Sequence, residues 1–169
     1  MLYRYLLILI ACAAVLGGVQ VPNFLDQYAK RVDAHRAEAE AALAGYRQIA
    51  ERETGGSLEA LIARHDASTD PVFKAEAAPI RNLYERYRRF AAEQAGLQTD
   101  WLGRLRYVLL HPDRELLLET RRQYSPALVL DRSAFLSGGL AALLALLIVE
   151  LLAAVLRALF APRRHELRW

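Results

Sequence analysis

Glu150 is the residue whose type and position could most directly do chemistry, because it is the one ionisable group in the apolar stretch 134–156. A carboxylate inside a membrane span is costly unless it is neutral, paired or close to water. Three interpretations follow. Glu150 lies near the inner end of a span, two helical turns from Arg157, and reaches toward water; it contacts a partner helix; or it handles protons. We favour the first.

The other residue types associated with catalysis lack the required spacing. None of the four histidines has another histidine or a cysteine at metal-ligand spacing. The serines have no nucleophile-elbow context, and no glycine-rich phosphate loop occurs. The sequence therefore predicts no catalytic, cofactor-binding or metal-binding residue and no cofactor, and we expect a protein that is not an enzyme. We expect His35 to be packed on a helix rather than to coordinate a metal.

A cluster of arginines and aromatic residues at 86–90 resembles a nucleic-acid-binding patch when it is viewed alone. The surrounding residues 22–132 carry 17 Lys and Arg against 17 Asp and Glu, so the region as a whole is neutral. A nucleic-acid surface is normally a basic face. We therefore expect a solvated helix surface at 86–90 and no nucleic-acid partner.

Two apolar runs, at 5–21 and 134–156, lie at opposite ends of the 169-residue chain. A helix needs about 20 apolar residues to cross a bilayer. We predict transmembrane helices within residues 1–21 and 133–160. The first run could instead be a cleaved signal peptide, or a lipoprotein signal ending before Cys12. Because the run continues past Cys12, we favour the retained span.

The charges at the two ends predict a topology. The net charge of +3 comes from arginines beside the apolar runs, chiefly in the basic tail at 161–169. Short loops rich in Lys and Arg stay on the cytoplasmic side. We expect a two-pass protein of the bacterial inner membrane, with both termini cytoplasmic and residues 22–132 periplasmic.

The central region has the punctuation of a helical domain. Pro22 and Asn23 are expected to end the first span, Gly55-Gly56 to stop the next helix, and Asp70-Pro71 to start a later one. Pro79 should kink or divide that later helix. The predicted elements are two long helices, at about 24–53 and 71–97, and short helices at about 57–65, 101–110 and 113–123.

The two long helices carry apolar stripes with coiled-coil-like spacing of three and four residues, which predicts an antiparallel hairpin. The first stripe comprises Leu25, Tyr28, Val32, His35, Ala39, Ala42, Tyr46 and Ile49. The second comprises Ile80, Leu83, Tyr87, Phe90, Gln94 and Leu97. The predicted fold class is all-α, with two transmembrane helices flanking a periplasmic antiparallel helical hairpin or bundle.

Small residues at the outer ends of both apolar runs are candidates for helix packing. Such residues let helix backbones approach closely where lipid supplies no hydrophobic drive. The two spans pack on each other there, or the same face docks on another membrane protein. The candidates are Gly17, Gly18, Gly138, Gly139 and Ala142.

The segment 101–110 has a broad apolar face beside two arginines. It is an amphipathic helix lying on the outer leaflet, or it closes the bottom of the helical domain. The sequence favours neither interpretation.

With these elements placed, several short motifs occur in a fixed order relative to the two spans. They are Gly17–Pro22, Asp26-Gln27-Tyr28, Asp33-Ala34-His35, Asp70–Phe73, Glu119-Thr120 and Tyr124–Leu128. On these motifs the chain resembles a family of uncharacterised two-span inner-membrane proteins of Gram-negative bacteria, known as a domain of unknown function. The resemblance covers nearly the whole chain. It implies location and architecture, and supplies no activity or site residue.

These observations favour an accessory or scaffold subunit. We expect it to contact the lipid bilayer and to bind a larger membrane complex, or a second copy of itself, through the hairpin and the spans. The alternative is a periplasmic sensor or ligand-binding module. Because few residues follow the second apolar run, such a module would pass its signal to a partner protein.

Overall fold

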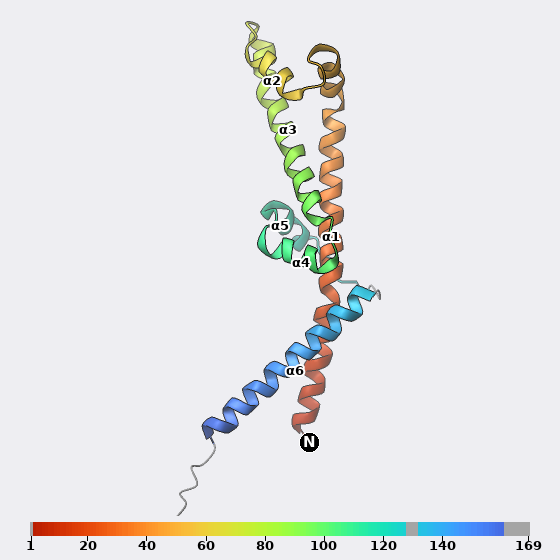
Figure 1. The fold of residues 1–169 in the computed structure, drawn as a ribbon, viewed down its shortest axis with the longest axis vertical. Helices are drawn as coiled ribbons and strands as arrows, with labels where there is room; N and C mark the ends of the chain where they lie inside the picture. The colour runs from red at the N-terminus through yellow and green to blue at the C-terminus, as the bar shows by residue number, and fades with distance from the viewer. Residues whose placement is uncertain (1, 128–131, 161–169) are drawn as a thin grey trace, which may run out of the picture. The chain divides into compact units, whose positions relative to one another are not determined.

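The computed structural model of the chain describes residues 2–127 and 132–160, and all of its regular structure there is α-helical (Figure 1). Six helices lie in these residues: α1 (Leu2–Glu53), α2 (Leu58–Asp66), α3 (Pro71–Leu97), α4 (Trp101–Leu110), α5 (Arg114–Arg122) and α6 (Arg132–Phe160). The predicted all-α class is therefore confirmed, with two long apolar helices at the ends of the chain and shorter helices between them. The predicted basic tail at 161–169 lies outside the described residues.

The chain divides into two compact units. Unit 1 comprises Met1–Phe24 and Ser125–Trp169, and unit 2 comprises Leu25–Tyr124. Helix α1 contributes its first part to unit 1 and the remainder to unit 2, whereas α6 belongs wholly to unit 1.

Local side-chain bonds set the helix boundaries in unit 2. Gly55 and Gly56 have φ values of 61° and 89°, which end α1 in the left-handed region that glycine tolerates. The Oγ of Ser57 accepts a hydrogen bond from the amide of Ala60 and caps α2. Aspartate caps α3, α4 and α5 in the same way. The caps at Asp70 and Asp113 accept amide bonds of 2.8–3.1 Å.

Helices α1 and α3 of unit 2 are antiparallel, as predicted. Tyr28 contacts Glu93, whereas Arg47, further along α1, lies over the ring of Tyr87, earlier in α3. Figure 1 shows the two helices side by side, with α2 packed on the first half of α3. The buried core between these elements includes Leu25, Tyr28, Val32, Leu43, Leu61, Ile80, Phe90 and Leu116.

The stripe predicted on α1 is wrong at its C-terminal end. The buried positions follow it as far as Ala39 and then change to Leu43 and Ala50, whereas Ala42 and Ile49 are exposed. An α-helix has 3.6 residues per turn, so a strict three-four alternation drifts around a straight helix. The shift brings Leu43 and Ala50 into one cluster with Leu58 and Leu61 of α2.

The predicted helix end at Pro22 is wrong, and so is the predicted division of the later helix at Pro79; a kink at Pro79 stays a prediction. Helix α1 continues through Pro22 and Asn23, and α3 is a single helix through Pro79. Proline removes one backbone hydrogen bond, a cost that tertiary interactions can offset. Near Pro22 such an interaction is present within unit 1, because the buried Asn23 donates from Nδ2 to the carbonyl oxygen of Ser125, at 3.2 Å.

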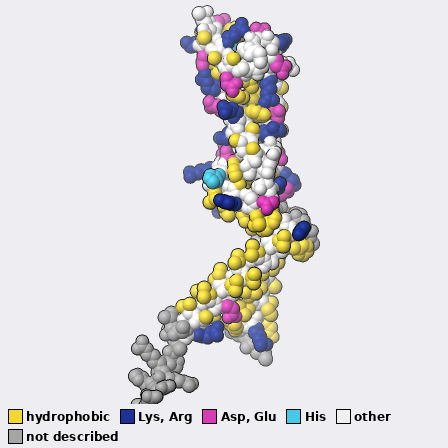
Figure 2. All heavy atoms as spheres, viewed as in Figure 1, with side chains coloured by type: hydrophobic (Ala, Val, Ile, Leu, Met, Phe, Trp, Pro, Cys, Tyr) yellow, Lys and Arg dark blue, Asp and Glu magenta, His cyan; other side chains and the backbone are white. Residues whose placement is uncertain are grey.

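Unit 1 carries the two apolar helical segments. In the described residues, two helices are long and apolar enough to cross a membrane, one within Tyr3–Glu53 and the other at Arg132–Arg157. Hydrophobic side chains cover the visible face of α6, whereas charged side chains are spread over the visible face of unit 2 (Figure 2). None of the most apolar window of α6 is buried within the chain.

Candidate functional site

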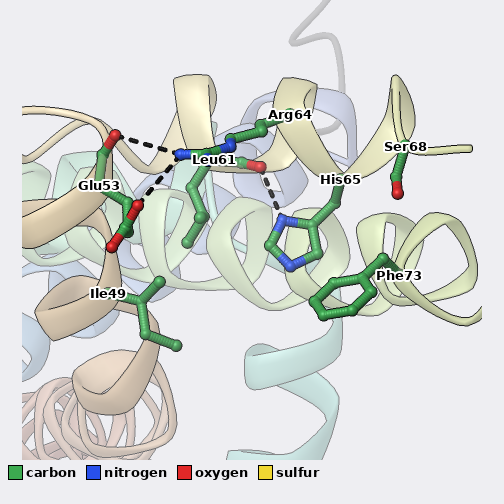
Figure 3. A pocket seen from close by; sticks show the side chains of 7 residues that line it. All are labelled: Ile49, Glu53, Leu61, Arg64, His65, Ser68 and Phe73. Carbon is green, nitrogen blue, oxygen red and sulfur yellow. Dashed lines mark hydrogen bonds and ion pairs between the residues drawn. The ribbon is translucent and has the colours of Figure 1, made fainter. Parts of the chain in front are cut away.

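A hollow of about 350 Å³ lies in unit 2 at the end where α1 stops and α2 and α3 meet. We call it the tip hollow, and Figure 3 shows the side chains that surround it. Its lining residues are Ile49, Glu53, Leu61, Arg64, His65, Ser68 and Phe73. Ile49 and Phe73 are 39% and 52% exposed, and the neighbouring Val72 is 67% exposed, so the hollow and its rim present apolar surface.

Short-range bonds hold the polar side chains of the tip hollow in place. The Nη1 of Arg64 donates to the carbonyl oxygen and to Oε2 of Glu53, at 3.5 and 3.3 Å. The Nδ1 of His65 lies 2.8 Å from the carbonyl oxygen of Leu61, so this nitrogen carries the proton (Figure 3). The His65 ring lies 5.8 Å from that of Phe73. The Nε2 of His65 lies 3.7 Å from Oε2 of Glu76.

The tip hollow follows from the three boundaries that surround it. The glycine pair after Glu53 turns the chain into α2, and the Asp70 cap places Phe73 in the first turn of α3. His65 and Phe73 were not among the predicted site residues. Two exposed apolar residues beside a helix start, Val72 and Phe73, were the signal available in the sequence.

At the opposite end of α3, unit 2 contains a buried polar cluster, here called the base network: Tyr28, Glu93, Tyr107 and Asp113. The two tyrosine hydroxyls donate to Oε1 and Oε2 of Glu93, at 2.5 and 3.1 Å. The amide of Asp113 donates to the Tyr28 hydroxyl oxygen at 3.0 Å. Tyr28 is fully buried and Glu93 is 7% exposed. The network therefore ties α1, α3, α4 and the start of α5 together.

Burial and the carboxylate determine the protonation of the base network. Burial raises the pKa of the Tyr28 hydroxyl, and its hydrogen bond to Glu93 raises it further. Burial and the charge of Glu93 also raise the pKa of Tyr107. Both phenols therefore stay protonated and donate to the carboxylate. Because both carboxylate oxygens of Glu93 accept hydrogen bonds, we interpret the base network as a structural connection rather than a reactive centre.

A second group of polar residues connects α1 to α5. Glu119 accepts from Nη1 of Arg31 at 2.6 Å and lies 2.9 Å from Nε2 of His35. The hydrogen bond from His35, followed by that from Arg31, lowers the pKa of Glu119. The His35 ring also lies 5.3 Å from the ring of Phe90. His35 is thus packed on the helix, as predicted.

Among the predicted packing residues in unit 1, Gly18 and Gly138 lie where α1 and α6 approach. A Cβ atom at Gly18 would lie 2.6 Å from the backbone oxygen of Ser137 and 2.7 Å from Cβ of Ala141. A Cβ atom at Gly138 would lie 2.9 Å from Val19. Positions 17 and 139 have open space instead. Ala142 is partly buried, and the alanine nearest Gly18 is its neighbour Ala141.

Glu150 lies in α6 with two partners in unit 1. Its Oε2 is 3.7 Å from Nη2 of Arg157, the residue two turns later. Its Oε1 accepts a hydrogen bond from the Tyr3 hydroxyl at 2.9 Å. The first contact fits the interpretation of a carboxylate near the end of the apolar segment. The second is a helix–helix contact, with α1 as the partner helix, so it fits the second interpretation given above.

The predicted absence of chemistry remains a prediction. In the described part of the chain, no three His, Cys, Asp or Glu residues lie together in a way that could hold a metal ion. Of the arginine-rich cluster at 86–90, Phe90 is buried in the core, and Arg89 pairs with Asp113 and Glu115 at 3.2 and 2.7 Å. Arg86 and Arg88 are exposed.

Comparison with known proteins identifies a family. The family model described as "Protein of unknown function (DUF2937)" matches residues 2–162 of the chain. No curated protein matches it, and no solved structure does.

Proposed function

Since this chain belongs to the DUF2937 family, whose description assigns no activity, we propose its function from its own residues. It is a non-enzymatic protein of the bacterial inner membrane. It acts as an accessory or scaffold subunit that binds a larger membrane complex, or a second copy of itself, through its helical hairpin and spans.

The observation that carries this proposal is the apolar surface around the tip hollow. Ile49, Val72 and Phe73 are all exposed, although they are among the residue types that proteins normally bury. A cluster of exposed apolar side chains with a polar rim is typical of a surface that binds another protein, a membrane or a ligand. The ion pair between Arg64 and Glu53, at 3.3 Å, supplies part of that rim. We therefore assign partner binding to the tip hollow.

The membrane location is supported by the two apolar helices of unit 1 and by charge. The C-terminal basic tail follows α6 in the sequence, which favours cytoplasmic termini and a periplasmic unit 2. Fusions of alkaline phosphatase and of green fluorescent protein near residue 80 test this topology. We expect phosphatase activity without fluorescence; the reverse pattern would contradict the proposed location.

Site-specific photo-cross-linking tests partner binding. A benzoylphenylalanine at position 73 is expected to capture one discrete partner in native membranes. The matched control places the same group at Glu85, an exposed residue of α3 outside the tip hollow. Capture at 73 that disappears in a Val72→Asp background, with little capture at 85, supports the proposal. A chain that stays monomeric with no product at 73 contradicts it.

The second candidate function is a sensor, and the lining of the tip hollow, in which polar side chains lie beside apolar ones, favours it. Its volume of about 350 Å³ lies within the range typical of small-ligand sites, roughly 300–1,000 Å³. His65 and Ser68 offer hydrogen bonds beside the apolar lining. A metabolite that raises the melting temperature of the wild-type chain in detergent, but not that of Phe73→Ala, supports this function. A broad screen without any shift argues against it.

A further inference from the structure

Helix α4 leaves an apolar face uncovered in unit 2. Val108 is its buried residue, whereas Leu102, Leu109 and Leu110 are 51%, 71% and 60% exposed. Leu102 and Leu109 are seven residues apart, which places them on one side of the helix, and Leu110 lies next to that side. We propose that this face lies in the outer leaflet of the membrane that the chain spans. The inference rests on the membrane location proposed above.

The opposite face of α4 is fixed to unit 2, so the leucines cannot turn inward. The Tyr107 hydroxyl donates to Oε2 of Glu93 at 3.1 Å. Its ring lies against Gly96, where a Cβ atom would be 2.2 Å from the ring. The Nε of Arg104 donates to the carbonyl oxygen of Leu97 at 3.0 Å. Helix α4 is thus held at several points on one side and presents leucines on the other.

The charge of α4 matches a lipid surface, whose phosphate groups are negatively charged. Residues 101–110 contain two arginines and no aspartate or glutamate. Arg106 is exposed, and its spacing puts it between Leu102 and Leu109 on the uncovered face. Arginine can bury its aliphatic stem among lipid chains while its guanidinium stays near the phosphates. Trp101, at the start of the helix, is a residue type enriched at membrane interfaces.

The position of α4 along the chain also points to lipid. The base network links Tyr107 to Glu93, and Glu93 to Tyr28 of α1. In the sequence, Tyr28 comes seven residues after Val21, the last residue of the first apolar run. Within unit 2, helix α4 is therefore linked through Glu93 to the part of α1 that is closest in sequence to the first apolar run. The tip hollow is at the other end of the α1–α3 pair.

Spin labelling of the full-length chain in lipid vesicles tests this inference. Cys12 is the one cysteine of the sequence, so a Cys12→Ser background allows a single label at Leu109→Cys. Two further positions are controls: Leu144→Cys, exposed on α6, and Val72→Cys, exposed at the tip. The vesicles contain phosphatidylethanolamine with phosphatidylglycerol. Collision with oxygen reports lipid, and collision with a water-soluble nickel chelate reports solvent.

We expect the ratio of oxygen to nickel accessibility at Leu109 to exceed that at Val72 several-fold and to stay below that at Leu144, because an interfacial helix lies less deep than the middle of a span. A Leu109 label as open to nickel as the Val72 label, while Leu144 stays shielded, overturns the inference and leaves the spans intact. Low accessibility to both reagents means that protein covers this face, and also overturns it. A Leu144 label open to nickel contradicts the proposed membrane location itself.

Discussion

In unit 2 the helices pack through large buried side chains, whereas in unit 1 α1 and α6 approach each other at glycines. Phe90, Tyr28 and Leu43 fill the interior of the hairpin, and Glu93 bonds to two tyrosines there. At the crossing in unit 1, Gly18 faces the backbone of Ser137 and Gly138 faces Val19.

The difference in residue size follows from the source of helix–helix attraction in water and in lipid. In water, burying leucine and aromatic surface drives helices together, so large residues are useful at the contact. In lipid the surroundings are as apolar as the side chains, and close backbone approach becomes the better source of attraction. The residue types at the two contacts are those expected if unit 2 is in water and the crossing of unit 1 is in lipid.

The largest expected effect is the loss of a large side chain from unit 2. Phe90→Ala should lower the free energy of unfolding by about 3–5 kcal/mol. The Phe90 side chain is only 2% exposed, so its removal leaves a buried cavity. Chemical denaturation of the full chain in detergent, followed by circular dichroism, measures this. Phe73→Ala, at a position 52% exposed, is the matched control and should cost far less. Equal losses would contradict the assigned core.

Removing the central acceptor of the base network should have the next largest effect. Glu93→Ala leaves two tyrosine hydroxyls and the amide of Asp113 without this carboxylate, and should cost about 3 kcal/mol. The same denaturation experiment measures the change. Glu85→Ala, at an exposed position on the same helix, serves as the control. A Glu93 variant as stable as wild type would show that the network adds nothing.

A side chain added at the crossing of unit 1 should also destabilise the chain, but by less than the loss of a large side chain from unit 2. Gly18→Ala places a Cβ 2.6 Å from a backbone oxygen, so the helices must separate, at about 1–3 kcal/mol. Gly17→Ala, with open space around it, should be neutral or slightly stabilising. Unfolding in mixed micelles compares the two. If both variants behave alike, small size at residue 18 is not what brings the helices together.

The smallest effect concerns pH. Because His35 and Arg31 lower the pKa of Glu119 in the folded chain, this carboxylate contributes stability above its ordinary pKa of 4.5. That contribution is lost as the pH falls through the lower, folded pKa. Glu119 is partly exposed, so we expect less than about 1 kcal/mol. Glu119→Gln should flatten this part of an acid-unfolding profile, and an unchanged profile would contradict the assignment.

The sequence was sufficient for the elements of unit 2 whose boundaries are encoded locally. Helices α2 and α3 begin at the predicted caps, Ser57 and Asp70, which bond to amides within three residues. Helix α1 ends at the predicted glycine pair, Gly55-Gly56. The helix end expected at Pro22 and the division expected at Pro79 are absent, because a missing backbone bond is tolerated within these helices. The residues next to a proline in the sequence do not indicate whether tertiary contacts will compensate for the missing backbone bond.

The candidate site was less accessible to sequence reasoning. Glu93 and Gln94 both fit the spacing between Phe90 and Leu97, and a carboxylate is the less expected of the two in a core. Only its distant partners, Tyr28 and Tyr107, explain why Glu93 is buried. The tip hollow likewise requires three segments to converge, which no single stretch of sequence specifies.

The hydrogen bond from the amide of Asp113 to the Tyr28 oxygen joins residues 85 positions apart. The same amide lies 3.4 Å from Oε1 of Glu93 on α3, so its proton exchanges with deuterated solvent when Asp113 separates from both α1 and α3. If that separation requires global unfolding of unit 2, the exchange rate of the Asp113 amide reports the free energy of unfolding of the whole hairpin. The exchange rate of this one amide would then report how often the whole helical hairpin opens.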